Sequence, residues 1–142
     1  RTFAMNYLLD TCVISEFIKA KPSALALQWI KEKHEQSLYL SAISVAEIQR
    51  GIAKMPKSKR KNELNIWFGK IQTQFDGRIL SFDQKAAVLW GNEIAKLESI
   101  GKQMPSIDGF IASIASSQQM CLVTRNSSDF KHFPVEQINP WQ

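Results

Sequence analysis

Two hydrophobic patterns alternate along the chain. Short apolar runs such as "YLL" and "CLV" are typical of buried strands, and longer segments with an apolar residue at every third or fourth position are typical of amphipathic helices. We predict strands at residues 6–9, 37–42, 78–82 and 120–124, with a fifth at 135–138. We predict helices at residues 13–20, 23–34, 44–54, 63–75, 84–100 and 105–118.

Three of the predicted helices have a defined apolar face that we expect to point into the core. In the helix at 63–75 this face consists of Leu64, Trp67, Phe68, Ile71 and Phe75. In the helix at 84–100 it consists of Leu89, Trp90, Ile94, Leu97 and Ile100. In the helix at 105–118 it consists of Ile107, Phe110, Ile111 and Ile114. Asp83 is the expected N-cap of the middle helix and Gly101 its expected stop.

Alternation of short buried strands with amphipathic helices predicts an α/β fold with a mostly parallel sheet. Parallel strands are covered on both faces, which explains their uninterrupted apolar runs. The length of 142 residues is typical of one domain, and no linker or repeat divides the chain. We expect Met5 to be the native start and residues 1–4 to be a tag or an upstream extension.

Composition narrows the cellular setting and the partners. Two isolated cysteines, Cys12 and Cys121, are too few for a disulfide framework, so we expect buried free thiols in a reducing cytoplasm. No apolar run is long enough for a membrane span. A net charge of +5 and a pI of about 9.3 favour anionic partners such as nucleic acid. Residues 54–63 carry five cations, which indicates a solvated connector or, less commonly, a contact to a phosphate backbone.

Acidic and amide side chains follow the predicted strands. Asp10 comes directly after the first strand, and Asn126 and Asp129 come shortly after the fourth. Glu47 and Asp108 lie near the starts of two helices. Because ligands of open α/β sheets bind beyond the carboxyl ends of the strands, these side chains are candidates for one site.

Each of these side chains also has an ordinary structural explanation. Asp10 is a suitable N-cap, and Glu47 has capping-box spacing from Ser44, which would account for Glu47 completely. Asp108 in a first helical turn interacts favourably with the helix dipole. Asn126 and Asp129 are common turn residues. Capping does not predict the combination of these residues. If the first and fourth strands are neighbours, the three acids and the Asn126–Asp129 loop converge.

Carboxylates that converge at neutral pH require a cation. Ligands that offer only oxygen suit Mg²⁺ or Mn²⁺. In a basic protein such a cluster indicates metal-assisted hydrolysis of phosphodiesters, in which the metal activates water and stabilises charge on the phosphate.

Four motifs, in this order, resemble the PIN domain: "NYLLDTCVISEF", "SAISVAEIQRGI", "PSIDGFIASIA" and "LVTRNSSDF". More narrowly, the chain from Met5 to its end resembles the VapC/FitB-type toxins of bacterial toxin–antitoxin pairs. The resemblance implies a five-stranded, mostly parallel sheet in the order 3-2-1-4-5 between helices. It also implies a Mg²⁺- or Mn²⁺-dependent endoribonuclease.

Carried over by position, the resemblance assigns roles to acids of this chain. Asp10, Glu47 and Asp108 match the three signature acids, which catalyse and bind metal. Family members place the fourth acid where either Asn126 or Asp129 stands here. We assign the fourth acidic role to Asp129, with Asn126 as a neighbouring metal ligand.

Further residues are assigned supporting roles. Thr11 and Thr124 are expected to hydrogen-bond the acids from behind, and Arg50, Lys54 and Arg125 to hold the RNA backbone. The resemblance also implies a homodimer and a small antitoxin that occludes the active site.

Two other readings compete with the nuclease. A phosphatase of the haloacid-dehalogenase type also begins with an aspartate after its first strand, but it carries a second one where Cys12 stands. A non-catalytic PIN-like module would bind RNA or a partner without cleavage. The intact acids Asp10, Glu47 and Asp108 argue against it, whereas the amide of Asn126 favours it.

Overall fold

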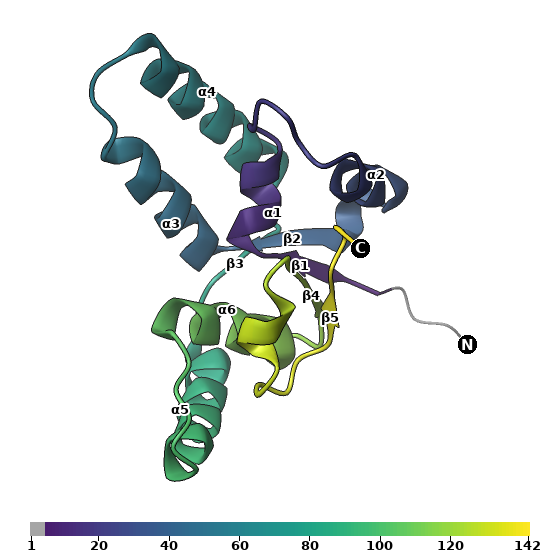
Figure 1. Ribbon diagram of the computed structural model, residues 1–142, viewed down its shortest axis with the longest axis vertical. Coiled ribbons are helices and arrows are strands. Elements are labelled where there is room, and N and C mark those ends of the chain that lie inside the picture. Colours follow the sequence, from purple (N-terminus) through teal and green to yellow (C-terminus); the bar gives the residue numbers. More distant parts are fainter. Residues whose placement is uncertain (1–4) are drawn as a thin grey trace.

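The computed structural model describes residues 5–142 (Figure 1), so the expectation for residues 1–4 lies outside the described part. Within it, a five-stranded sheet has the predicted order β3-β2-β1-β4-β5, and every pairing is parallel. The strands are β1 (Tyr7–Leu9), β2 (Leu38–Ser41), β3 (Ile79–Leu80), β4 (Cys121–Val123) and β5 (Gln137–Ile138). The predicted fold class is confirmed.

The helices lie on both sides of this sheet (Figure 1). They are α1 (Thr11–Glu16), α2 (Ala24–Glu32), α3 (Ala42–Ala53), α4 (Lys59–Gln74), α5 (Gln84–Ser99) and α6 (Ser106–Ser117), with short 3₁₀ turns η1 (Glu35–Ser37) and η2 (Ser127–Phe130). Helices α3 and α4 form a hairpin that projects beyond the sheet on one side, and α5 projects on the other. None of the helices in residues 5–142 has the length and hydropathy that crossing a bilayer requires.

Two hydrophobic clusters sandwich the sheet, because successive strand residues point to opposite faces. Leu9 packs into one cluster with side chains of α1, α3 and α4, and Leu8 packs into the other with side chains of α5 and α6. Burial of both faces explains why the strands are short apolar runs rather than alternating ones.

The helix after β1 is displaced from its predicted position at 13–20. It begins at Thr11, because the Asp10 carboxylate accepts a hydrogen bond from the Thr11 backbone N–H at 2.8 Å and caps the helix directly after the strand. It ends at Glu16, whose buried carboxylate accepts the Ser23 backbone N–H at 2.6 Å and so turns the chain into α2. The prediction that Asp10 is an N-cap is therefore confirmed.

The basic stretch at 54–63 is only partly a connector. Helix α4 begins at Lys59, with Ser58 as its N-cap. The Lys61 ammonium donates to the carbonyl oxygens of Ala53 at 3.3 Å and Met55 at 2.9 Å, which ties the start of α4 to the end of α3. Because ammonium groups favourably meet the carbonyl end of a helix, this cation has a structural role.

The predicted apolar faces are buried or partly buried, except at two residues, Ile100 and Ile107. Ile111 is fully buried, whereas Ile107, one turn nearer the start of α6, is 40% exposed. Ile100 is 65% exposed because α5 ends at Ser99 and the helical period no longer orients the next residue. Gly101, at a φ of 72°, makes the predicted stop.

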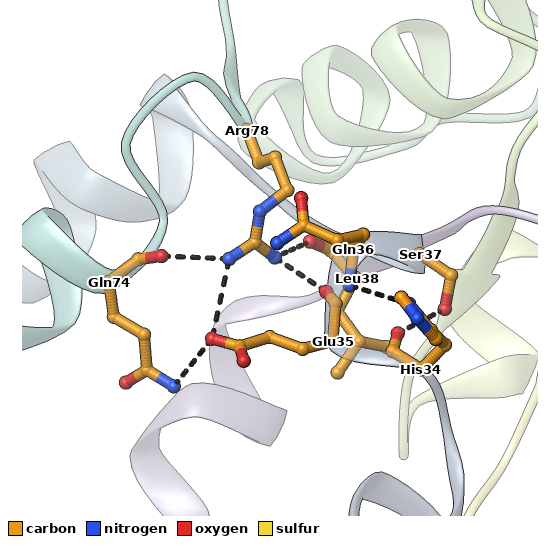
Figure 2. Close-up of polar contacts among 7 residues, drawn as sticks. All are labelled: His34, Glu35, Gln36, Ser37, Leu38, Gln74 and Arg78. Atoms are coloured by element: carbon orange, nitrogen blue, oxygen red, sulfur yellow. Dashed lines mark hydrogen bonds and ion pairs between the residues drawn. The ribbon is translucent and has the colours of Figure 1, made fainter.

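Arg78, just before β3, joins η1, the start of β2 and the end of α4 (Figure 2). Its guanidinium donates to the carbonyl oxygens of Glu35 at 2.7 Å, Leu38 at 2.6 Å and Gln74 at 2.7 Å, and it lies over the Phe75 ring. Arg78 is only 7% exposed. A buried guanidinium is stable when all of its partners are in place, so Arg78 fixes the start of β2 against the end of α4.

We predict that Arg78→Met lowers the free energy of unfolding by about 2–4 kcal/mol, because three carbonyl groups lose their charged donor. Urea unfolding measures this change. The matched control is Arg60→Met, since Arg60 is exposed and makes one bond, to the Ile18 carbonyl at 3.2 Å. Equal stability of the two variants would contradict the assigned role of Arg78.

Candidate active site

Asp10 is a buried carboxylate at the carboxyl end of the central strand. It is 5% exposed and accepts hydrogen bonds from the Thr11 backbone N–H at 2.8 Å and the Thr124 hydroxyl at 2.8 Å. The Cys12 thiol lies 3.7 Å from Oδ2. Burial raises the pKa of Asp10, and these donors oppose the shift. The Asp10 side chain therefore caps α1, and its ionised carboxylate is disfavoured by burial at the edge of the sheet.

Glu47 reaches the same edge from α3, and its capping-box interpretation is wrong. The N-cap of α3 is Ser41, whose side chain accepts the Ser44 backbone N–H, so Glu47 lies in the second turn of the helix. The Thr11 hydroxyl donates to Glu47 Oε1 at 2.6 Å and so links α3 to α1. Because the cap is supplied elsewhere, the position of Glu47 is not explained by capping.

Asp108 lies in the first turn of α6, as predicted, and its charge is disfavoured. Its pKa is raised to about 6, first by burial and then by the charges of Asp10, Asp129 and Glu47. Like charges raise one another's pKa only when they lie close together. The carboxylates of Asp10, Asp129 and Glu47 therefore lie within electrostatic range of Asp108.

The loop after β4 brings Asn126 and Asp129 to this edge. The Asn126 backbone N–H donates to the Thr124 hydroxyl at 3.0 Å, and the Asp129 backbone N–H donates to the Asn126 carbonyl at 2.9 Å. Phe130, which is 1% exposed, anchors the turn in the core. The side chains of Asn126 and Asp129 are exposed, and the charge of Asp129 adds to the larger effect of burial in raising the pKa of Asp10 and of Asp108.

The acids approach one another without forming a preformed cage. Among residues 5–142, no three Asp, Glu, His or Cys side chains are gathered closely enough to hold a metal ion as they stand. Their donor chemistry nevertheless fits a hard divalent cation, because every candidate offers oxygen and their mutual repulsion is relieved by positive charge.

The three predicted RNA-binding residues, Arg50, Lys54 and Arg125, are all exposed; two belong to α3 and its C-cap, and one to the loop after β4. Arg50 and Lys54 lie three and seven residues after Glu47, on α3 and at its C-cap, and so share a side of that helix with it. Arg125 follows the buried Thr124, and its guanidinium lies over the Trp141 ring, 5.5 Å from the centroid.

Sequence reasoning missed two buried polar residues, Glu16 at the end of α1 and Ser44 in α3. Glu16 is 3% exposed, and its hydrogen bond from the Ser23 backbone, followed by its contact with Lys19, lowers its pKa. Ser44 is fully buried, and its hydroxyl lies 2.8 Å from the Thr11 hydroxyl. The spacing of Ser44 from Glu47 was visible in the sequence, but it suggested a cap. Cys12 is half-buried rather than buried, whereas Cys121 is buried as expected.

The protein is thus a parallel α/β domain with acidic side chains at the carboxyl edge of its sheet. Residues 7–136 match the family model described as PIN domain. Because this match covers most of the chain, the protein belongs to the PIN-domain family, as its motifs predicted.

Relatives with names and solved structures resemble nearly the whole chain. VapC ribonuclease Y4jK of Sinorhizobium fredii is 38% identical over 136 residues, which are 95% of this chain and 97% of that protein. Toxin FitB of Neisseria gonorrhoeae is 35% identical over 94% of this chain and 97% of its own length. The solved structure of FitAcB from Neisseria gonorrhoeae has a TM-score of 0.91 at 34% identity and covers 96% of this chain and 99% of that chain.

We predict that Asp108→Asn stabilises the metal-free protein at pH 8. The pKa of Asp108 is about 6 in the folded chain against an ordinary 3.8, so the folded state binds more protons between these values and the ionised carboxylate costs stability above pH 6. The gain should be on the order of 1–2 kcal/mol, because partial exposure reduces the full effect of the shift. It should vanish below about pH 4, where both states are protonated.

Urea unfolding in EDTA at pH 8, 6 and 4 measures this gain. Asp76→Asn is the control, because Asp76 is an exposed aspartate outside the acid cluster and should show no gain at any pH. A gain of equal size at pH 4 and pH 8 would show that charge repulsion at Asp108 is not its cause.

Proposed function

We propose that this protein is a ribonuclease toxin, an endoribonuclease that depends on Mg²⁺ or Mn²⁺ and arrests translation and growth until an antitoxin inhibits it. One observation carries the proposal: the four acids come from four separate segments at the carboxyl edge of the sheet, and burial together with neighbouring charges raises the pKa of Asp10 and Asp108. The names of the relatives, VapC ribonuclease and toxin FitB, support RNA as the substrate and toxicity as the biological role.

Asp10 and Asp108 would hold the divalent ion, together with Asp129 or Asn126. The electrostatic influence of Asp129 on both Asp10 and Asp108 supports it as the charged fourth ligand. Asn126 offers an amide oxygen next to the Thr124–Asp10 contact. When bound, the ion supplies Lewis acidity toward the phosphate and lowers the pKa of water.

The chain's own residues position the reactants. Glu47 would bind the ion or orient the attacking water and take its proton, while the Thr11 hydroxyl holds one Glu47 oxygen in place. The Thr124 hydroxyl holds Asp10 in the same way. In-line attack by water on the phosphodiester would leave a 5′-phosphate and a 3′-hydroxyl. The exposed cations Arg50, Lys54 and Arg125 would bind the RNA backbone on both sides of the acids.

Two surfaces of the protein support proposals about its protein partners, and one of them is a groove beside Glu47. A groove of about 230 Å³ runs between α1, α3 and α4, and its lining includes Thr11, Glu47, Ile48, Met55 and Trp67. Such a groove, apolar along its length and polar beside the acids, supports docking of an antitoxin segment that occludes the site. We further propose that the protein forms a homodimer and acts in the cytoplasm. Exposed apolar residues of α5, such as Val88, would contribute to the dimer interface.

The decisive test is RNA cleavage by Asp10→Asn. Purified, antitoxin-free protein is incubated with total bacterial RNA in Mg²⁺, Mn²⁺ or EDTA, and the new 5′ ends are sequenced. We expect discrete ends with either metal and none with EDTA. Asp10→Asn should lower the rate about 100-fold or more, the loss expected when several kcal/mol of metal-derived stabilisation disappears.

Asp76→Asn, which changes an exposed aspartate outside the acid cluster, is purified in the same way and should cleave like the wild type. Loss of cleavage in Asp10→Asn alone then excludes a contaminating nuclease. RNA that is bound equally well in EDTA but never cut would favour a non-catalytic binding module instead. Cleavage that survives in Asp10→Asn would refute the proposed site.

The RNA contact of α3 is tested by removing Arg50 and Lys54 together. For single-stranded RNA, Arg50→Ala/Lys54→Ala should raise KM with little change in kcat and reduce the slope of log affinity against log salt by about 1.4. Lys96→Ala/Lys102→Ala removes the same charge from the tip of α5 and should leave the slope unchanged. An equal loss of slope in both pairs would indicate a general charge effect rather than a contact.

A further inference from the structure

Three hydroxyl groups form a connected chain behind Glu47. Ser41 Oγ lies 3.3 Å from Ser44 Oγ, and Ser44 Oγ lies 2.8 Å from Thr11 Oγ1. Thr11 Oγ1 lies 2.6 Å from Glu47 Oε1. Ser41 and Ser44 are both fully buried, and neither has a role in the proposed reaction. A buried polar chain that ends on a candidate catalytic acid requires an explanation.

The direction of these hydrogen bonds follows from the number of protons. A carboxylate only accepts, so Thr11 donates its single hydroxyl proton to Glu47. The Thr11 oxygen then accepts from Ser44, and Ser44, having donated its own proton, accepts from Ser41. The Ser44 backbone N–H donates to Ser41 Oγ at 3.0 Å and fixes the first hydroxyl of the chain. All three hydroxyl protons therefore point toward Glu47.

We propose that Ser44, supported by Ser41, is a positioning residue for Glu47. This inference rests on the proposed function, in which Glu47 binds the ion or orients water. Without Ser44, the Thr11 oxygen loses the donor that polarises its own hydroxyl, and the short charge-assisted bond from Thr11 to Glu47 Oε1 is weakened. Solvent does not replace the lost donor, because Ser44 has no exposed surface. The long Glu47 side chain then samples other rotamers at the moment when it must face the acids.

Binding of Mn²⁺ alone, followed by electron paramagnetic resonance, tests this role without RNA. In the antitoxin-free protein, Ser44→Ala should weaken Mn²⁺ binding about 10-fold to 100-fold, the range for residues that orient metal ligands. Ser117→Ala is the matched control: Ser117 is also a buried helical serine, but its hydroxyl donates to the Ile114 carbonyl of its own helix. Wild-type affinity in Ser44→Ala would overturn the proposal.

A double-mutant cycle separates positioning from a general packing defect. Thr11→Val breaks the chain between Ser44 and Glu47, so the Ser44→Ala/Thr11→Val protein should bind Mn²⁺ no more weakly than Thr11→Val alone. If the fold-decreases in Mn²⁺ affinity of the two single variants multiply in the double variant, Ser44 does not act through Thr11, and the proposal is contradicted. With RNA, Ser44→Ala should lower kcat and leave KM within about twofold, since the backbone contacts are intact.

A crystal structure of Ser44→Ala decides the question even if the protein proves to bind neither RNA nor metal. We expect Glu47 Oε1 to move beyond about 3.5 Å from Thr11 Oγ1. An unchanged Glu47 would overturn the positioning role, whereas absence of metal-dependent cleavage by the wild type would refute the proposed function instead. If Ser44→Ala does not fold, Ser44→Cys, which conserves shape and has only a weak donor, is examined in the same way.

Discussion

The parallel placement of β1 between β2 and β4 is the constraint on which the site depends. Parallel strands end at the same edge, so whatever follows β1, β2 and β4 must meet there. The backbone N–H of Asp10 donates to the Val123 carbonyl at 2.9 Å and continues the ladder into the site itself. The sheet therefore holds Asp10 as rigidly as a core residue. The segments after β2 and β4 carry Glu47 and Asp129 toward it, and Asp108 comes from the start of α6, which precedes β4.

The same rigidity makes the acidic edge costly. Burial and like charges raise the pKa of Asp10 and Asp108, so the folded chain holds ionised carboxylates against their mutual repulsion. Residues elsewhere compensate, including the two large hydrophobic clusters and the Arg78 network behind β2. A cation bound among these carboxylates would relieve their repulsion.

Polar residues behind the acids have more than one task. Asp10 caps α1 and faces the site, and Thr124 joins Asp10 to the loop that carries Asn126. Thr11 begins α1 and also connects it to Glu47. These contacts join residues at the ends of β1, β2 and β4. Because each hydroxyl donates its single proton to one acid, the orientations of Asp10 and Glu47 depend on the same hydrogen-bonded group of residues.

The sequence by itself determined the strand order, through its motifs, and the positions of Asp10 and Asp108, since strand ends and helix starts are local features. Only the structure decided which serine caps α3 and which one lies behind Glu47. The point at which α3 begins decides whether Ser41 or Ser44 is the cap, and the contact of Ser44 with Thr11 joins residues far apart in the sequence. It also decided that Ile100 and Ile107 are exposed and that Lys61 is tied to α3. Helical periodicity tells which residues share a face, but burial depends on what other segments of the chain cover it.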